Sequence, residues 1–298
     1  MNTKIKVSEN QLYLPNIHLI DSEQSFADAF FRAAQILHQQ LEEIKSAITN
    51  TKELAKEPFN LASLSLFSKM GRHYYSYVLL EIHQDRIGSQ FLIEHLCEAA
   101  ITLTYLLEEV DKSHFSEYMS ASVNQASYLL IDVEDQLHKS PNDRDLLSLS
   151  DKLKAFITKQ QNYAAENLHN LDSEAHLWEP ESADTTAKRA ADMGFNFMTN
   201  PARQIALRVM PASWLELQLS YLNSFADSFR IQEPTVINFT SMRNAAHLCL
   251  HTTQTFIEEV VNPQCIKSLN VERQQQTFNA LYEWFYNAHK AVSAHSRR

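Results

Sequence analysis

The sequence predicts an all-α fold: a single large antiparallel helical bundle of about nine helices. Only 3 glycines occur among 298 residues, and tight hairpins or phosphate-binding loops need glycine at positive φ. All 8 prolines fall outside the strongly periodic segments. This placement fits helices, because proline breaks a helix interior but is tolerated in loops and in the first helical turn. Residues 85–110 carry apolar side chains at steps of three and four, the spacing that lines one side of a helix.

Residues 85–110 form the expected central helix. A second stripe of side chains runs beside the first and is apolar except for Glu94 and Glu98. Because a helix with two apolar faces leaves little surface for water, we expect this helix to lie in the middle of the bundle. The first stripe contains Leu92, Leu96, Ala99, Leu103, Leu106 and Val110.

Two long helices are predicted before the central one. Residues 1–20 show no clear period and are expected to be an irregular lead-in. A first helix is predicted from about Ser22 to Leu54, and a second begins at Pro58, because proline is favoured in the first turn of a helix. Residues 21–298 are expected to form one helical domain, since no flexible linker divides them, and 171–211 is the candidate sub-boundary.

Further helices are predicted after the central one. Long helices are expected at 114–138 and 142–169, and an irregular loop follows at 171–181. Shorter helices at 182–193 and 212–229 flank a helical segment around 203–208. The last two helices are predicted at 234–261 and 268–295.

The composition excludes several classes of function. The formal net charge of −10 repels phosphate backbones, so no nucleic-acid partner is expected, although a local basic patch is compatible with it. The first residues lack the apolar segment of a signal peptide, and no run approaches the ~20 apolar residues that cross a bilayer. We therefore expect a cytoplasmic protein with no membrane partner. Cys97 and Cys249 lie in apolar helical pattern and are expected to be buried and inert.

Two carboxylates on the central helix need an explanation. Glu94 and Glu98 are one turn apart, and like charges at this spacing destabilise a helix by about 0.2–0.5 kcal/mol. A salt-bridge network with Lys69, Arg72 or Arg189 would compensate for this repulsion. The functional alternative is a carboxylate site for a metal ion or a proton transfer.

A column of polar residues is predicted on the helix at 234–261. Arg243, His247 and His251 follow one another at steps of four, and two histidines at this spacing can share a metal ion. The arginine would repel a divalent cation, and the glutamate of an HExxH motif is absent. We therefore expect no metal and no cofactor, and keep His247 and His251 as alternative metal ligands.

A family resemblance rests on two helical segments, SKMGRHYYSYVLLEI and FLIEHLCEAAITLTYL, with Trp178, Ala190, Gly194 and SYLNSFADSF further along. Over about residues 60–230 the chain resembles an uncharacterised all-helical bacterial family of unknown function, with suspected distant links to HEPN-type proteins. Its pattern is carried by Lys69, Glu98, Tyr105, Tyr221 and Ser224. Glu94 stands where an arginine is expected, and Asp227 where a histidine is expected. The resemblance therefore implies a fold rather than an activity.

The absence of a complete catalytic constellation predicts a non-enzymatic binding protein. Its partner is expected to be a protein or a small ligand held between helices. No arginine is followed by histidine at the spacing of the HEPN ribonuclease motif. The alternative is a metal-dependent or degenerate HEPN-like nuclease or hydrolase that uses His247, His251 and Glu98. The oligomeric state stays open, a homodimer included. The candidate binding residues are Glu94, Glu98, Arg72, Arg243 and Tyr105.

Overall fold

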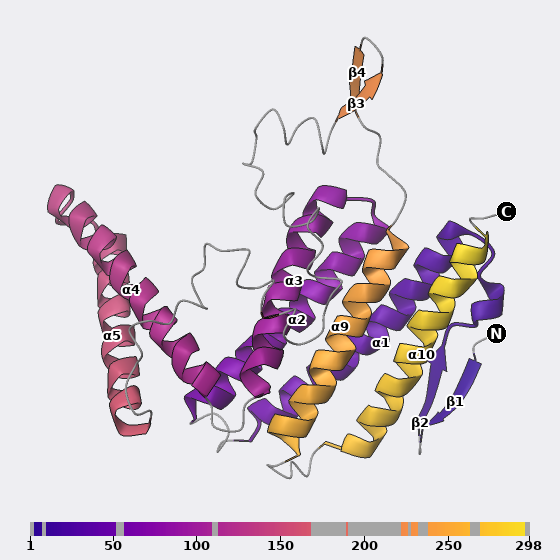
Figure 1. Cartoon of the computed structure of the whole chain (residues 1–298), viewed down its shortest axis with the longest axis horizontal. Helices are drawn as coiled ribbons and strands as arrows, with labels where there is room; N and C mark the ends of the chain where they lie inside the picture. The colour runs from indigo at the N-terminus through magenta and orange to yellow at the C-terminus, as the bar shows by residue number, and fades with distance from the viewer. Residues whose placement is uncertain are drawn as a thin grey trace. The chain divides into compact units, whose positions relative to one another are not determined.

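The computed structural model is mainly helical (Figure 1). It describes residues 3–7, 10–51, 57–108, 113–167, 189, 222–225, 228–231, 238–262 and 269–295. Seven α-helices and two short hairpins occur in this part of the chain. The predicted helical class is confirmed. The count of about nine helices and the single antiparallel bundle stay predictions.

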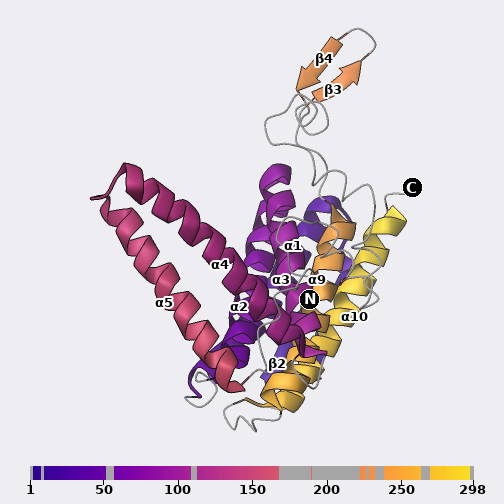
Figure 2. The same ribbon diagram turned by 60° about the vertical axis from the view of Figure 1, so that its left-hand side comes forward.

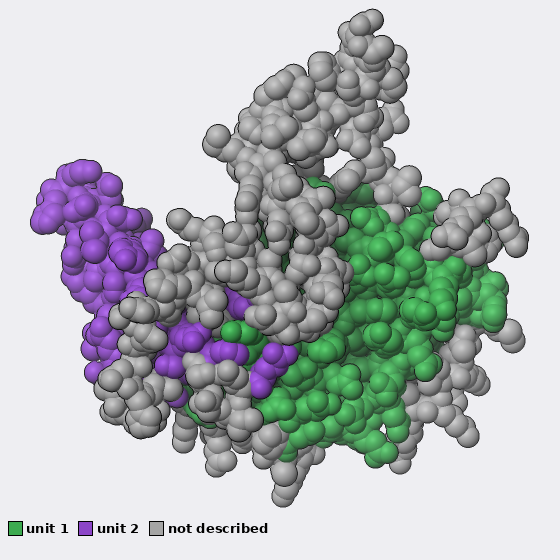
Figure 3. Space-filling model, viewed as in Figure 1, with its two compact units in different colours: residues 1–107, 194–298 green, residues 108–193 purple. Residues whose placement is uncertain are grey.

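The chain divides into two compact units, shown in green and purple in Figure 3. One unit contains residues 1–107 and 194–298, and the other contains residues 108–193. The junction after residue 193 lies inside the candidate sub-boundary at 171–211, whereas the sequence does not signal the junction after residue 107. A single domain over residues 21–298 stays a prediction.

Five of the described helices build the first unit. Helix α1 packs on α2 and α10, α2 packs on α3 and α9, and α9 also packs on α3 and α10. Figure 1 and Figure 2 both show α9 beside α10. The last helix, α10, also packs on the first, α1. A π-helical turn, Ile257–Val261, continues α9. The helices are α1 (Glu23–Thr49), α2 (Pro58–Ile82), α3 (Arg86–Leu107), α9 (Phe239–Phe256) and α10 (Val271–His295).

Local signals set the ends of these helices. Ser22 begins α1 with a capping box, in which its hydroxyl and that of Ser25 each accept the backbone N–H of the other residue. Pro58 occupies the first turn of α2, as predicted. A short turn at 83–85, with Gln84 at φ 59°, joins α2 to α3. Because this turn is short, α2 and α3 lie side by side and run in opposite directions.

Aromatic side chains from both ends of the chain form the core of the first unit. Phe30 of α1 is fully buried, and its ring centroid lies 4.8 Å from that of Phe285 on α10. Phe67 of α2 and Phe256 of α9 stack with their centroids 4.4 Å apart. These contacts bring α1, α2, α9 and α10 around one apolar interior.

Buried polar groups add two links between helices. The Glu81 carboxylate is 8% exposed and accepts the hydroxyl of Ser89 at 2.7 Å and the backbone N–H of Asn238 at 3.2 Å. The hydroxyl oxygens of Thr104 and Thr252 lie 3.1 Å apart between α3 and α9. Since these groups are removed from water, their hydrogen bonds offset the cost of burial and favour this arrangement of helices.

Helix α3 confirms one predicted stripe and only half of the other. Leu96, Leu103 and Leu106 are fully buried, as expected. In the second stripe, Ile101 and Tyr105 are buried, whereas Phe91 is 62% exposed and Glu98 also lies at the surface. The N-terminal half of this face is therefore open to water, so α3 is only partly enclosed.

Two β-hairpins differ from the sequence prediction. β1 (Thr3–Val7) pairs antiparallel with β2 (Asn10–Leu14) where an irregular lead-in is expected over 1–20. Lysine alternates with apolar residues in β1, which is the period of a strand. β3 (Leu222–Phe225) pairs with β4 (Ser228–Ile231) inside the range 212–229 that we predict as a helix. Strands this short carry too few residues for their period to outweigh the helical pattern around them.

In its described residues the second unit contains two long helices, α4 (Ser113–Lys139) and α5 (Arg144–Asn167), in agreement with the prediction. Asp143 begins α5 by accepting two backbone N–H groups, and Lys154 pairs with Glu134 at 2.9 Å. The predicted loop and helices at 171–181, 182–193 and 203–208 lie outside the described residues, apart from Arg189. None of the helices that the structure describes has the length and apolar character needed to span a membrane.

Replacing Phe30 by alanine tests the importance of the aromatic core. We expect Phe30→Ala to lower the free energy of unfolding by about 3–5 kcal/mol, because it leaves a cavity between α1 and α10. Leu61 on α2 is 40% exposed, so Leu61→Ala should change it by no more than about 0.5 kcal/mol. Urea denaturation followed by circular dichroism measures both, and equal effects would contradict this account of the core.

Candidate functional site

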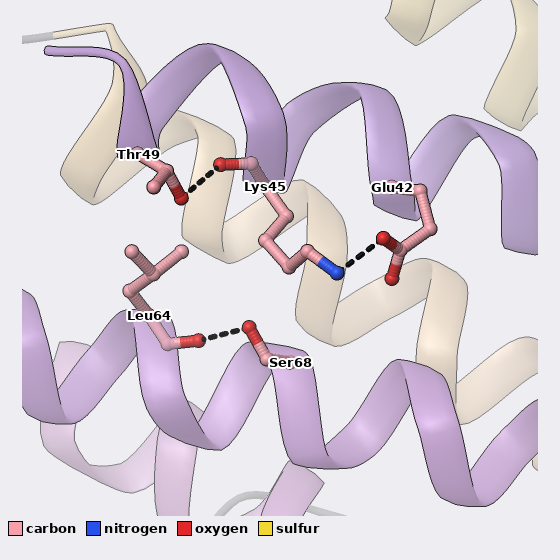
Figure 4. Close-up of polar contacts among 5 residues, drawn as sticks. All are labelled: Glu42, Lys45, Thr49, Leu64 and Ser68. Carbon is pink, nitrogen blue, oxygen red and sulfur yellow. Dashed lines mark hydrogen bonds and ion pairs between the residues drawn. The ribbon is translucent and has the colours of Figure 1, made fainter.

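A groove of about 500 Å³ lies between α1 and α2, and all but one of the residues that line it are polar or cationic. The α2 residues come in adjacent pairs, one helical turn apart, so they share one face of the helix. Figure 4 shows part of this groove, where Lys45 and Thr49 of α1 lie opposite Leu64 and Ser68 of α2. The lining residues are Lys45, Thr49, Leu64, Ser65, Ser68, Lys69, Arg72 and His73.

The two helices approach each other closely at Gly71. A Cβ atom at this position would lie 3.4 Å from Cδ1 of Leu41 on α1. Gly71 is buried, whereas its neighbour Arg72 is exposed. Glycine at this position therefore lets α1 and α2 pack closely beside the groove.

The three permanent cations of the groove differ in their partners. The Lys45 ammonium pairs with Glu42 on its own helix (Figure 4). Nζ of Lys69 lies 3.9 Å from a carboxylate oxygen of Glu98, and both side chains are about half exposed. Exposed pairs of this kind contribute only about 0–1 kcal/mol. Arg72 is exposed and makes no hydrogen bond or ion pair within the described residues.

The hydroxyl groups of Thr49 and Ser68 are already used as donors. Thr49 donates to the Lys45 carbonyl at 2.8 Å, and Ser68 donates to the Leu64 carbonyl at 2.8 Å (Figure 4). A serine or threonine nucleophile needs a general base that accepts its proton. These two hydroxyls instead bond to backbone carbonyls, so the groove offers charge for binding and no activated nucleophile at either position.

A row of rings leads from the groove towards α3. The ring centroids of His73 and His95 are 5.6 Å apart, and those of His95 and Phe91 are 4.4 Å apart. Burial lowers the pKa of His73, and the neighbouring His95 and Lys69 lower it further, against a smaller opposite effect of Glu98. His73 is therefore neutral at pH 7.

The structure brings some of the predicted binding residues together. Arg72 lines the groove, and Glu98 lies at its α3 side against Lys69. The contact between Lys69 and Glu98 is one of the salt bridges expected to compensate for the paired glutamates. Glu94 is half-buried on α3, and Tyr105 is 8% exposed near the end of that helix. Neither lines the groove, and the binding role of all four stays a prediction.

Arg243 and His247 belong to a second polar cluster, between α9 and α10. Nη1 of Arg243 lies 3.2 Å from Nδ1 of His289, and the Thr240 hydroxyl lies 3.1 Å from Nε2 of the same ring. Because arginine can only donate, Nδ1 accepts and the imidazole proton is on Nε2. His247 stacks on Tyr282 with ring centroids 4.2 Å apart.

The alternative metal site is not assembled in the part of the chain that the structure describes. No group of three or more histidine, cysteine, aspartate or glutamate residues suited to a metal occurs there. His247 packs against α10, whereas Glu98 faces α2, and His251 is exposed. The three residues of the nuclease alternative therefore lie in different surroundings.

The buried thiols agree with the prediction. Cys97 and Cys249 are both buried. Burial raises the pKa of the Cys249 thiol well above its ordinary value, so the reactive thiolate is disfavoured. Cys265 lies outside the described residues.

Sequence reasoning missed most of the groove. Lys45, Ser65 and Ser68 were not among the candidate residues, and His73 was considered only as a possible third metal ligand beside His247 and His251. The signal for the α2 residues is the recurrence of polar side chains at steps of four in SLSLFSKMGRH, which marks one polar face of α2. A polar helical face is ordinarily solvated, so this repeat becomes informative only once α1 is seen to supply Lys45 beside it.

A neutral His247 predicts a loss of stability in mild acid. Burial, with the nearby Arg243, lowers the pKa of His247 from 6.5 to about 4. Between these values the unfolded chain binds a proton that the folded chain does not, so the free energy of unfolding falls as the pH decreases. We expect the urea midpoint to fall between pH 6.5 and 4.5, and to fall less in His247→Phe, which keeps a ring on Tyr282.

The exposed His83 provides the matched control for this measurement. His83→Phe should leave the pH dependence of the urea midpoint as in the native chain. The account of His247 would be wrong if its phenylalanine variant lost stability with the same slope as the native protein.

Comparison of the chain with protein-family models, curated proteins and solved structures finds no match. The resemblance to a helical family of unknown function therefore stays a prediction. Among the residues that carry it, Ser224 lies on β3 rather than on the expected helix. Tyr221 and Asp227 lie outside the described residues, as do Trp178, Ala190 and Gly194.

Proposed function

We propose that this chain is a non-enzymatic binding protein that holds a small anionic ligand between α1 and α2. The observation that carries the proposal is Arg72, an exposed guanidinium with no partner within the described residues, beside Lys69 and Lys45. The chain as a whole is acidic, with a net charge of −10, whereas the groove lining contains three cationic residues and no carboxylate. We place its activity in the cytoplasm, as the sequence leads us to expect.

Electrostatics favour an anion at this position. The positive groups of Lys45, Lys69 and Arg72 repel one another, and a bound anion replaces repulsion with attraction. A phosphate or carboxylate can accept two parallel hydrogen bonds from the Arg72 guanidinium, while the Lys69 ammonium acts as a point charge. Ser65 is exposed and makes no hydrogen bond within the described residues, so its hydroxyl is available to a ligand oxygen.

The size of the groove favours a small molecule. Its volume of about 500 Å³ falls within the ~300–1,000 Å³ typical of ligand pockets. The groove spans only a few helical turns of α1 and α2. Of the two partners expected from the sequence, a protein or a small ligand held between helices, the groove is better suited to the small ligand.

Binding accounts for the groove better than catalysis does. Its serine and threonine donors Ser68 and Thr49 are bonded to backbone carbonyls, so neither is paired with a base. The Lys45 and Lys69 ammonium groups each form an ion pair with a carboxylate neighbour, Glu42 and Glu98 respectively. Besides the neutral His73, the groups that remain are the Ser65 hydroxyl and the positive charges of Lys45, Lys69 and Arg72, which suit recognition of an anion.

Removing the guanidinium of Arg72 tests this function. We expect Arg72→Gln to weaken the binding of inorganic pyrophosphate about tenfold or more, because a hydrogen bond to a charged group contributes roughly 1.5–3 kcal/mol. Lys69→Gln should have a smaller effect, since Glu98 already shares its charge. Isothermal titration calorimetry at low ionic strength measures both constants, and added salt should weaken binding further.

Lys152 on α5 supplies the control for net charge. Lys152 is exposed and is not among the residues that line the groove, and Lys152→Gln removes the same unit of charge, so it should leave pyrophosphate binding nearly unchanged. Failure of the native protein to bind pyrophosphate, or equal weakening by Arg72→Gln and Lys152→Gln, would refute the proposal.

A further inference from the structure

We infer that the anion in the groove is the phosphate of a nucleotide-like ligand, whose planar ring stacks on Phe91. This inference rests on the function proposed above and names the class of molecule bound. The groove and Phe91 are connected through His73 and His95, whose rings lie between them. A single molecule that reaches from Arg72 to Phe91 would follow this row.

The pairing of α2 with α3 sets the direction in which the rings lead from the groove. Because the helices run in opposite directions, Lys69 meets Glu98 and His73 meets His95. Phe91 precedes His95 by one turn, which is about 6 Å along the helix axis, on the side away from Lys69. The rings of His73, His95 and Phe91 therefore form a continuous row that starts at the groove, with successive centroids 5.6 Å and 4.4 Å apart. A ligand with a phosphate at Arg72 and a planar ring at Phe91 would extend along this row.

The exposure of Phe91 points to an aromatic partner. The side chain is 62% exposed, although it lies on the helix that carries the most apolar stripe of the chain. Its ring makes an edge-to-face contact with His95 at an interplanar angle of 78°, and its high exposure leaves much of the ring accessible to a ligand. Nucleobases stack on such faces with little dependence on which base is present.

The charges beside the rings set the orientation of the ligand. The Glu98 carboxylate lies 3.7 Å from Nδ1 of His95 and faces the row of rings on α3. It repels phosphate from this side, whereas Arg72 and Lys45 attract phosphate to the groove on the α1 side. The phosphate therefore lies at the groove, and the uncharged ring lies towards Phe91.

Two probes that differ only in the base test the inference. Adenosine 5′-monophosphate carries both base and phosphate, and ribose 5-phosphate lacks the base. We expect the native chain to bind the nucleotide about tenfold more tightly than the sugar phosphate. Phe91→Ala should remove this difference by weakening the nucleotide about tenfold while leaving the sugar phosphate unchanged. Phe91→Tyr should retain the preference, since it keeps an aromatic face.

Tyr128 on α4 is 72% exposed, so Tyr128→Ala is a matched loss of an exposed ring that should change neither constant. Equal affinity of the native chain for both probes, or unchanged nucleotide binding in Phe91→Ala, overturns the inference. In either case, loss of sugar phosphate binding in Arg72→Gln would still support the anion groove. If the native chain binds neither probe nor pyrophosphate, the proposed function and the inference both fail.

Discussion

Burial of the apolar face of α2 is the constraint on which the groove depends. Phe67, Met70, Tyr74 and Val78 follow one another at helical spacing and are at most 1% exposed. A helix that turns this stripe inward must turn the opposite stripe outward, because both are fixed to one backbone. The outward stripe contains the serines, lysine, arginine and histidine of the groove. The chemistry at the surface is therefore placed by packing in the interior.

The neighbours of α2 then decide what this outward stripe can do. α1 approaches within contact of Gly71 and adds Lys45 on one side. α3 follows α2 through a short turn and adds His95 and Glu98 on the other side. An isolated helix with the same polar face would be an ordinary solvated surface. Because α2 lies between α1 and α3, its polar face has cationic neighbours on the α1 side and aromatic neighbours on the α3 side.

Much of the helical fold is readable from the sequence, because its signals are local. Ser22 and Pro58 mark the starts of α1 and α2 through hydrogen bonding and backbone geometry within a few residues. The strands β3 and β4 were missed because their four residues each are too few to show a period. The exposure of Phe91 was missed because an aromatic residue on an apolar helix is ordinarily buried.

The groove itself required the tertiary structure. Lys45 and Arg72 lie on different helices, and nothing in the sequence states that α1 and α2 place them along one groove. Glu98 was recognised as an unusual charge, and its contact with Lys69 agrees with a predicted salt bridge. His247 was also recognised, but its stacking on Tyr282 gives it a packing partner rather than a metal site. The sequence thus predicts single unusual polar residues better than it predicts their neighbours in the folded structure.

The carboxylates beside the groove make anion binding a competition that favours multiply charged ligands. Glu42 neutralises Lys45, and Glu98 lies near Lys69, so only Arg72 is uncommitted when the groove is empty. A singly charged ion gains little beyond one guanidinium contact. A phosphate can also draw Lys69 from its weak, exposed pair, which costs no more than about 1 kcal/mol. Because the rest of the chain is acidic, a long polyanion would meet repulsion beyond the groove that a small phosphate ester avoids.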